Sequence, residues 1–292
     1  MSEITYVLIT AAYNEGAHIG STIEAVLAQS LSAHKWVIVS DGSTDNTDAI
    51  VKEYSERNSF IKYIRREKSS ESPSFVSKVY AIQEGYKLLS VAPYQFIGIL
   101  DADITFGRDY YERVISKFHE DTRLGIAGGF IYEPWAGVFR SRPSNRSTSV
   151  AGAIQLFRRE CYEAIGGHMS LPYGGEDWMC EILTRMKGWQ VTAFPDIVAF
   201  HHNPSEAKRG AIKNAIRQGK MDYSVGSHPL FELVKCVRRV QERPYFLRAL
   251  FRLLGFTWCV IKRERIEVST DVIGYLRREQ MNKLRILIHA PR

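Results

Sequence analysis

The chain has 292 residues, of which 45% are hydrophobic and 24% are charged. A chain of this length and composition can bury a substantial core, which excludes an intrinsically disordered protein. The formal net charge is +7, but residues 205–292 hold 19 Lys and Arg against 8 Asp and Glu, a net charge of +11 that leaves −4 for residues 1–204. The basic third fits an anionic partner, and charge alone does not choose between nucleic acid, an anionic membrane and a phosphorylated substrate.

Two features of the sequence bear on where the protein works. The cysteines form no Cys-x-x-Cys pair and have no metal-ligand spacing, which is typical of reduced thiols; they are Cys161, Cys180, Cys236 and Cys259. Residues 1–6 lack the basic flank and the apolar core of a signal peptide. We therefore expect a cytoplasmic protein, with the inner face of the membrane as an alternative location.

Strands and helices alternate along the first hundred residues. Apolar runs predict buried strands at residues 5–11, 36–40, 60–64 and 96–100, helical spacing predicts a helix after each of the first three, and the third helix follows a polar loop at 65–73. This alternation predicts a parallel, doubly wound sheet. Right-handed crossovers place the ends of the first, second and fourth strands at the same rim, where open α/β sheets bind ligands.

Acidic side chains follow two of these strands. Asp101 and Asp103 come directly after the fourth strand, and Asp41 ends the second strand within Ser40–Asp45. Carboxylates at the ends of strands can ligate a hard cation that also binds a phosphate. The same residues are also explained by an acidic turn or a helix cap. We expect Asp41, Asp101 and Asp103 to converge at the rim.

Three motifs in this order resemble the amino-terminal half of the family 2 glycosyltransferases with the GT-A fold. They are Val7–Asn14, Ser40–Asp45 and Asp101–Asp103. Two departures are visible, because Ala12 stands where a proline is usual and Ser40 replaces the first acid of the second motif. Neither departure removes a group that the chemistry needs, since Asp41 remains.

The resemblance implies an α/β fold of GT-A type. This fold is a mostly parallel, doubly wound, Rossmann-like sheet with helices on both faces, here with a basic helical extension at the carboxyl end. It further implies that Tyr13 and Asp41 receive a nucleotide base, that Asp101 lies near the ribose and the metal, and that Asp103 ligates a divalent cation. The other positions assigned to the nucleotide are Ala11, Glu15, Ala102 and Lys78. For Lys78, a solvated helix lysine is the open alternative.

The second half of the sequence contains a Glu-Asp pair at a predicted helix start, Glu176 and Asp177. Acids there usually complement the helix dipole. With Gly174-Gly175 before it and Trp178 after it, the pair resembles the Glu-Asp motif of the family. By that match Asp177 is the general base that deprotonates the attacking hydroxyl, and Glu176 supports the acceptor. One base without a carboxylate nucleophile implies single displacement with inversion.

Two histidines end an apolar run at residues 197–202. A histidine at a strand end is more often structural, but in this family one can complete the metal site at this place. His201 matches best, and His202 is a close alternative. Imidazole with carboxylates suits Mn²⁺ and tolerates Mg²⁺, which would stabilise the leaving nucleoside diphosphate.

Other segments of the second half have two interpretations each. The loop 133–145, with its aromatic and basic residues, could cover the acceptor or could pack on its own aromatic rings. A strand is predicted at 150–157, with Gly152 where a ligand could approach the backbone. The basic helix at 244–265 is too short to span a bilayer, and it fits a membrane interface as well as packing on the catalytic domain or on a second subunit.

We therefore expect a catalytic domain at 1–204, divided into a nucleotide-binding half at 1–105 and an acceptor-binding half at 106–204, and a basic helical region at 205–292. The expected activity is metal-dependent, inverting transfer from a nucleoside-diphosphate sugar to a saccharide or lipid-linked acceptor in polysaccharide or glycolipid assembly. Because Asp41 can accept a hydrogen bond from a pyrimidine imide, UDP or dTDP is favoured, and a guanine fits as well. A peripheral contact with the membrane and association with a second copy of the chain are also expected.

Two other activities fit the sequence less well. A nucleotidyltransferase would need a Gly-rich phosphate loop with its lysine, which the amino-terminal region lacks. A non-enzymatic nucleic-acid or membrane binder built on the basic third would leave the buried strands that end in acids unexplained. No zinc finger or RNP-like motif supports the nucleic-acid version, and the Gly-x-x-Gly spacing occurs only at Gly125 and Gly128, inside the apolar run 125–132. We therefore expect no nucleic-acid partner.

Overall fold

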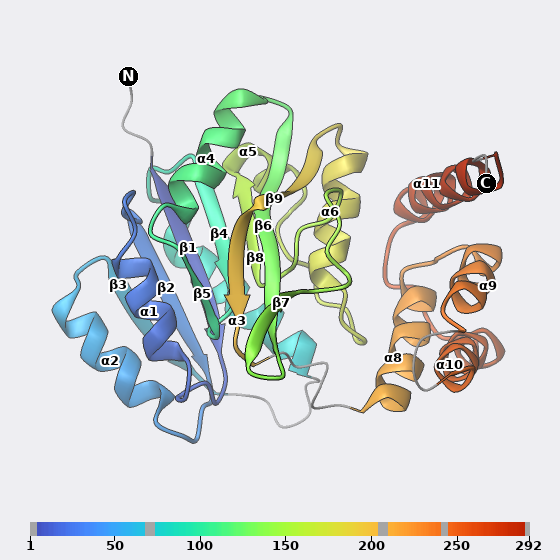
Figure 1. The fold of residues 1–292 in the computed structure, drawn as a ribbon, viewed down its shortest axis with the longest axis horizontal. Helices are drawn as coiled ribbons and strands as arrows, with labels where there is room; N and C mark the ends of the chain where they lie inside the picture. Colours follow the sequence, from blue (N-terminus) through green and yellow to red (C-terminus); the bar gives the residue numbers. More distant parts are fainter. Residues whose placement is uncertain (1–4, 68–73, 204–209, 241–244, 290–292) are drawn as a thin grey trace. The chain divides into compact units, whose positions relative to one another are not determined.

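The computed structural model describes residues 5–67, 74–203, 210–240 and 245–289. The chain forms two compact units: an α/β unit of residues 1–170 and 176–203, and a helical unit of residues 171–175 and 204–292 (Figure 1). The expected domain boundary between residues 204 and 205 lies outside the described residues and stays a prediction. The chain start at 1–4 and most of the predicted polar loop at 65–73 also lie outside them.

The α/β unit begins with the alternation that the sequence predicted. Its elements are β1 (Tyr6–Ala12), α1 (Ile19–Leu27), β2 (Lys35–Asp41), α2 (Thr47–Arg57), β3 (Ile61–Arg66), α3 (Ser74–Leu89), β4 (Phe96–Leu100), β5 (Ile104–Phe106), α4 (Tyr110–Glu120), β6 (Leu124–Trp135), β7 (Val138–Ser141), β8 (Ile154–Arg158), α5 (Arg159–Ala164), α6 (Glu176–Met186) and β9 (Gln190–His201).

One mixed sheet joins these strands in the order β3-β2-β1-β4-β8-β6-β9-β5, with β7 paired to β6. The strands β3, β2, β1 and β4 are parallel, as their apolar runs predicted. Strand β8 then pairs antiparallel with both β4 and β6, and β5 pairs antiparallel with β9. The parallel half therefore ends where β8 enters the sheet.

Three predictions for the second half were wrong in detail. Residues 150–153 form a turn instead of the start of a strand, because the N–H of Ile154 donates to the carbonyl of Ala151 and the N–H of Val150 donates to Glu181. The apolar runs at 190–194 and 197–202 belong to one strand, β9, whose pairing with β6 shifts register between Gly129 and Phe130. Much of the loop 133–145 is a β-hairpin.

The hairpin joins β6 to β7 by a two-residue turn at Ala136 and Gly137. Both residues have positive φ, 49° and 81°, which is the backbone that a tight hairpin of this type requires. The ring of Phe139 packs against the ring of Phe200, with centroids 5.0 Å apart, while Trp135 stays 65% exposed. The hairpin thus carries both a packed and an exposed aromatic side chain.

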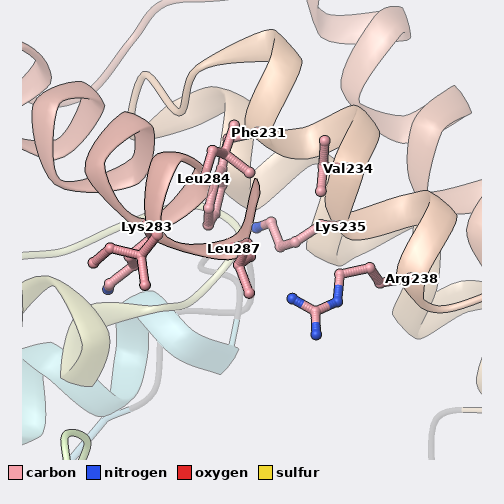
Figure 2. Close-up of a pocket in the computed structure, with 8 residues that line it drawn as sticks. Phe231, Val234, Lys235, Arg238, Lys283, Leu284 and Leu287 are labelled. Atoms are coloured by element: carbon pink, nitrogen blue, oxygen red, sulfur yellow. The ribbon is translucent and has the colours of Figure 1, made fainter. Parts of the chain in front are cut away.

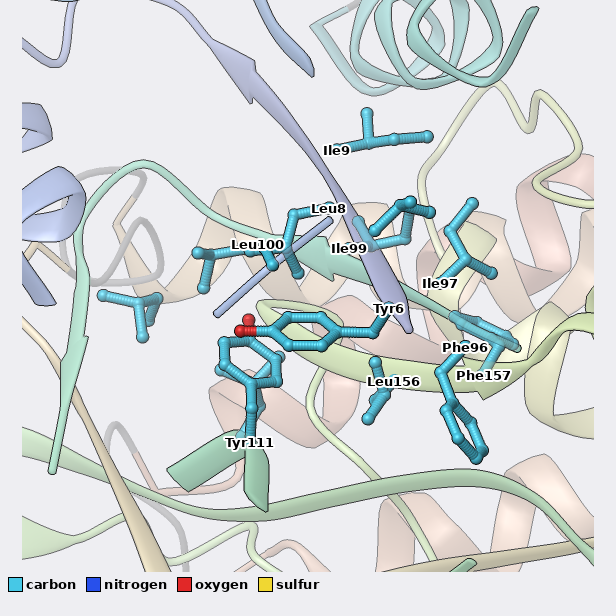
Figure 3. Close-up of a cluster of buried hydrophobic side chains, with 14 of the residues drawn as sticks. Tyr6, Leu8, Ile9, Phe96, Ile97, Ile99, Leu100, Tyr111, Leu156 and Phe157 are labelled. Atoms are coloured by element: carbon cyan, nitrogen blue, oxygen red, sulfur yellow. The ribbon is translucent and has the colours of Figure 1, made fainter. Parts of the chain in front are cut away.

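The core of the α/β unit is built around β1 and β4 (Figure 3). Tyr6 is fully buried, its ring stacks on Tyr111 with centroids 4.6 Å apart, and its hydroxyl donates to the carbonyl of Leu31 at 2.9 Å. Burial raises the pKa of the Tyr6 phenol. The phenol oxygen of Tyr6 is therefore buried with a hydrogen-bond partner, as buried polar atoms usually are.

The helical unit contains α8 (Ala211–Ser224), α9 (Pro229–Arg238), α10 (Leu247–Lys262) and α11 (Thr270–His289). Residues 171–175 belong to it, and the hydroxyl of Tyr173 donates to Glu264 at 2.8 Å. Across the described ranges, every helix falls short of the length or the hydrophobicity that crossing a membrane would require.

Candidate active site

The carboxyl ends of β1, β2 and β4 meet at one edge of the sheet. Parallel pairing aligns Ile9 with Ile99 and Ala11 with Val39. Asp41 is the last residue of β2, and Asp101 follows β4 directly. The sheet thus brings to one rim the strand-exit acids that the sequence assigned to a nucleotide.

Four further positions of the predicted nucleotide site lie at or near this rim. Tyr13 is 45% exposed, so its ring is accessible to a planar base. The backbone N–H of Glu15 donates to Thr47 at 2.8 Å. Ala102 is buried and its carbonyl accepts a hydrogen bond from Thr22, while Ala11 lies inside β1. Of these positions, Tyr13 is the one with a widely exposed side chain.

Asp41 is buried and ion-paired with Arg66, the last residue of β3. The Arg66 guanidinium also donates to the hydroxyl and the carbonyl oxygen of Ser77 in α3, at 3.1 and 3.2 Å. A base that binds Asp41 would therefore share its carboxylate with Arg66. Sequence reasoning missed Arg66, although the rule that strand ends build the rim applies equally to β3.

Asp103 and His201 meet because β5 pairs antiparallel with β9, with Ile104 opposite His201. Nε2 of His201 lies 3.2 Å from Oδ2 of Asp103, and Nδ1 lies 3.6 Å from Oε1 of Glu133. Burial alone would lower the pKa of His201, but the carboxylates of Asp103 and Glu133 outweigh it and raise the pKa to about 9. Glu133 was not predicted as a site residue.

His202 points elsewhere. Its Nε2 lies 2.8 Å from the hydroxyl of Thr105, and its ring stacks on His18 with centroids 5.9 Å apart. Burial lowers the pKa of His202. Of the two histidines, His201 is therefore the one whose ring nitrogen faces Asp103.

A divalent cation fits Asp103 and His201 as a two-residue site. Within the described ranges no group of three or more His, Cys, Asp or Glu residues is arranged to hold a metal. The carboxylate of Asp103 and the Nε2 of His201 nevertheless face each other, with Glu133 beside the opposite ring nitrogen. That arrangement is the one in which a carboxylate orients a ligating imidazole. The remaining ligands of such an ion would have to come from a bound diphosphate and water.

Lys78, for which a solvated helix lysine was the alternative, is 30% exposed and ion-paired with Asp101. Its Nζ lies 2.6 Å from Oδ1 of Asp101. Burial would lower the pKa of Lys78, but the negative charges of Asp101, Glu176 and Asp177 outweigh it and raise the pKa. The acid that follows β4 and the acids at the start of α6 thus all raise the pKa of the same ammonium group.

Asp177 and Glu176 occupy the first turn of α6 and have different environments. Oδ1 of Asp177 accepts from the N–H of Trp178 at 2.8 Å, and a Cβ atom added to Gly152 would lie 2.4 Å from Oδ2. Glu176 is 7% exposed, and its Oε2 has no hydrogen-bond partner within the described part of the chain. Burial and the neighbouring Asp177 raise the pKa of Glu176 to about 7, although Lys78 opposes this.

A polar hollow of 190 Å³ opens beside Asp177. Arg142, Ser149, Trp178 and Glu181 are among the residues that line it. Glu181 is buried, accepts from the hydroxyl of Ser149 and the N–H of Val150, and has a pKa raised by burial to about 7. Sequence reasoning missed Glu181, because a single acid inside a helix gives no signal.

The chain matches one family model and several curated proteins. The family model for glycosyl transferase family 2 matches residues 7–174. Poly-beta-1,6-N-acetyl-D-glucosamine synthase of Staphylococcus aureus (strain COL) is 32% identical over 281 residues, covering 88% of this chain and 63% of that protein. The synthase of the same name from Staphylococcus epidermidis is 30% identical over 121 residues, 41% of this chain and 27% of that protein. The chain thus spans less than two thirds of the length of these relatives.

Two solved structures share the fold. The mannosyltransferase PcManGT from Pyrobaculum calidifontis, in complex with GDP-Man and Mn²⁺, has a TM-score of 0.57 and 18% identity, covering 99% of this chain and 82% of that chain. GalNAc-T7, solved with UDP, GalNAc and Mn²⁺, has a TM-score of 0.59 and 14% identity, covering 94% of this chain and 58% of that chain. At these identities the similarity concerns the fold.

Proposed function

Because the chain belongs to glycosyl transferase family 2, we propose that it is a metal-dependent, inverting glycosyltransferase that uses a nucleoside-diphosphate sugar. The family and the GT-A fold predicted from the sequence are confirmed. The metal, the donor, the acceptor and the roles of individual residues are our proposals.

In the donor half, the proposed roles follow from where each side chain lies. The exposed ring of Tyr13 stacks on the base, and Asp41, oriented by Arg66, accepts a hydrogen bond from it. Asp103 and His201 hold the cation, which when bound supplies Lewis-acid stabilisation of the leaving diphosphate. Lys78, paired with Asp101, adds a positive charge beside the same phosphates.

In the acceptor half, Asp177 takes the proton of the acceptor hydroxyl as it attacks the anomeric carbon. The polar hollow beside Asp177 receives the acceptor, and the buried Glu176 supports its orientation. With a base on one side and a phosphate leaving group on the other, a single displacement inverts the anomeric centre.

The observation that carries the proposal is the position of Lys78. Its ammonium group lies 2.6 Å from Asp101 and also responds to Glu176 and Asp177. The acids assigned to the donor and to the acceptor therefore both act on Lys78, which supports two half-sites close enough for direct transfer from a nucleotide sugar to a hydroxyl.

The donor proposed first is a UDP- or dTDP-sugar, with a GDP-sugar as the alternative. The named relatives are polysaccharide synthases, which supports a saccharide or lipid-linked acceptor in polysaccharide or glycolipid assembly. The cytoplasmic location, a peripheral membrane contact and a homodimer remain predictions of the sequence.

Proton NMR of donor hydrolysis tests this proposal. The chain is incubated with Mn²⁺ and an α-linked UDP-, dTDP- or GDP-sugar, and the anomer released first is identified. We expect one nucleotide series to be hydrolysed with the β-anomer first, and the Asp103→Ala variant to be inactive. Release of the α-anomer first, or equal turnover after chelation of all divalent metal, would contradict the proposal.

A further inference from the structure

Helix α10 exposes an apolar stripe along its whole length. Its large apolar side chains recur at helical spacing, and each is at least 44% exposed: Leu247, Leu250, Leu254, Trp258 and Ile261. Helix α9 exposes three more at the same spacing, each at least 47% exposed: Leu230, Leu233 and Val237. Contiguous exposed apolar surface of this kind marks an interaction site.

The opposite face of α10 is fixed against α8, so the stripe cannot turn inward. A Cβ atom at Gly255 would lie 2.2 Å from the carbonyl oxygen of Ile216, which shows how closely the two helices approach. Next to this contact the buried Arg252 donates to Glu232 at 2.7 Å and is ion-paired with Asp222. Rotation of α10 would break these ion pairs and leave buried charges without partners, which costs several kcal/mol.

The exposed charges at the ends of α9 and α10 are mostly positive, with the half-buried Glu264 as an acid among them. The sequences of α9 and α10 contain a single acid, Glu232, and it is fully buried. Exposed cations lie near the helix ends, at Arg238, Lys262 and Arg265. The ammonium group of Lys262 also lies 5.2 Å from the centre of the Trp258 ring. An apolar face with cations at its ends complements a surface that is apolar inside and anionic at its boundary.

A pocket between α9 and α11 has the same chemistry. It measures 380 Å³, and Figure 2 shows Phe231, Val234, Leu284 and Leu287 around it together with Lys235, Arg238 and Lys283. Because Lys235 is ion-paired with Asp222 and Glu232, and Lys283 with Glu279, Arg238 is the cation placed to meet an anionic headgroup above an acyl chain.

We propose that the exposed apolar side chains of α10, together with those of α9, dock on a bilayer containing anionic phospholipids. The apolar stripe enters the boundary between headgroups and acyl chains, and the cations meet lipid phosphates. A second copy of the chain is a poorer occupant, because two such faces would bring mostly positive charges together with few opposing acids. This inference concerns the helical unit and does not depend on the proposed chemistry.

Sedimentation with lipid vesicles tests the inference on the full chain. Vesicles of phosphatidylcholine alone are compared with vesicles that also contain phosphatidylglycerol, whose negative surface potential attracts basic side chains. The Leu250→Ser/Leu254→Ser variant removes two exposed stripe side chains, and Lys262→Gln/Arg265→Gln removes two charges. The matched control is Val91→Ser, at an 89% exposed position of the α/β unit. Circular dichroism checks the fold of each variant.

We expect the wild-type chain to pellet with anionic vesicles and to remain in the supernatant with neutral ones. The Ser pair should reduce the partition coefficient on the order of tenfold or more, and the charge pair should reduce the preference for anionic lipid. The Val91 control should behave as wild type. The inference would be overturned if the wild-type chain did not sediment with anionic vesicles. It would also be overturned if the folded Leu250→Ser/Leu254→Ser variant sedimented with them as much as wild type does. A dimer, seen by light scattering, that the Ser pair abolishes while vesicle binding persists would overturn it as well.

Discussion

Gly152 faces Asp177 so closely that a Cβ atom at position 152 would lie 2.4 Å from Oδ2 of the carboxylate. The absence of a side chain at this position is therefore a condition for the present location of Asp177. The sequence pointed to Gly152 as a place where a ligand could approach the backbone, and in the structure it is the proposed base that does so.

Gly152→Ala should displace Asp177 without removing its carboxylate. We expect turnover to fall about tenfold or more, since a shift on the order of 1 Å at a reacting group is costly, while nucleotide binding is kept. Steady-state kinetics and nucleotide titration measure the two effects. Gly20→Ala is the control, because the nearest atom to its new Cβ is 3.9 Å away. Equal kinetics for both variants would mean that Asp177 is not held by this contact.

Glu176 should make stability depend on pH. Its pKa is raised by burial to about 7 in the folded protein from an ordinary value of 4.5, so the folded state binds more protons than the unfolded state between these pH values. The free energy of unfolding should therefore fall as pH rises through this window and level off above pH 7.

Glu176→Gln, which stays neutral, should lack this decline. The variant should gain roughly 2–3 kcal/mol relative to wild type between pH 5 and pH 8, measured by urea unfolding. The exposed Glu160→Gln is the control. A pH-independent difference between Glu176→Gln and wild type would show that Glu176 is ionised throughout.

Glu133 should orient His201 for metal binding. Its Oε1 lies 3.6 Å from Nδ1 of His201, on the side of the ring away from Asp103. Glu133→Gln should weaken Mn²⁺ binding by about 10- to 100-fold, as loss of such an outer carboxylate typically does. Electron paramagnetic resonance of free Mn²⁺ measures this without turnover. The exposed Glu56→Gln in α2 should bind as wild type, and equal affinity of both variants would exclude the orienting role.

The buried ion pairs of the helical unit should be sensitive to loss of their cation. Arg252 is 4% exposed and pairs with Asp222 and Glu232. Arg252→Met leaves those carboxylates buried with less compensation, which should cost about 3–5 kcal/mol in urea unfolding. The exposed Arg278→Met in α11 should change little. A loss below about 1 kcal/mol for Arg252→Met would mean that water or Lys235 replaces the guanidinium.

The parallel half of the sheet was predictable because buried parallel strands are continuous apolar runs, and strand exits are then fixed by crossover handedness. The short strand β5 gave no such signal, since three residues cannot establish a period. Strand β9 was read as two strands because Pro195 and Asp196 resemble a turn, whereas Gly129 on β6 lets the chain bulge there.

The candidate site was predictable where side chains follow strand ends. Asp101, Asp103 and His201 were named from position and resemblance, and the structure brings Asp103 and His201 to 3.2 Å. Arg66 and Glu133 were missed, because their partners are set by strand register and not by sequence spacing. Long-range pairing of single charged residues leaves no local pattern to read.

The most direct test of the account is nucleotide-dependent thermal stability. The chain is melted with UDP, dTDP, GDP, CDP or ADP, each with and without Mn²⁺, and compared with Asp103→Ala and Asp177→Ala. A ligand at a hundred times its dissociation constant adds about 2.7 kcal/mol, enough to shift the melting temperature by several degrees. We predict that one diphosphate stabilises the wild type and Asp177→Ala with metal only, and that Asp103→Ala gives no shift. No response from any diphosphate in folded wild-type chain, or the same response in Asp103→Ala, would contradict the account.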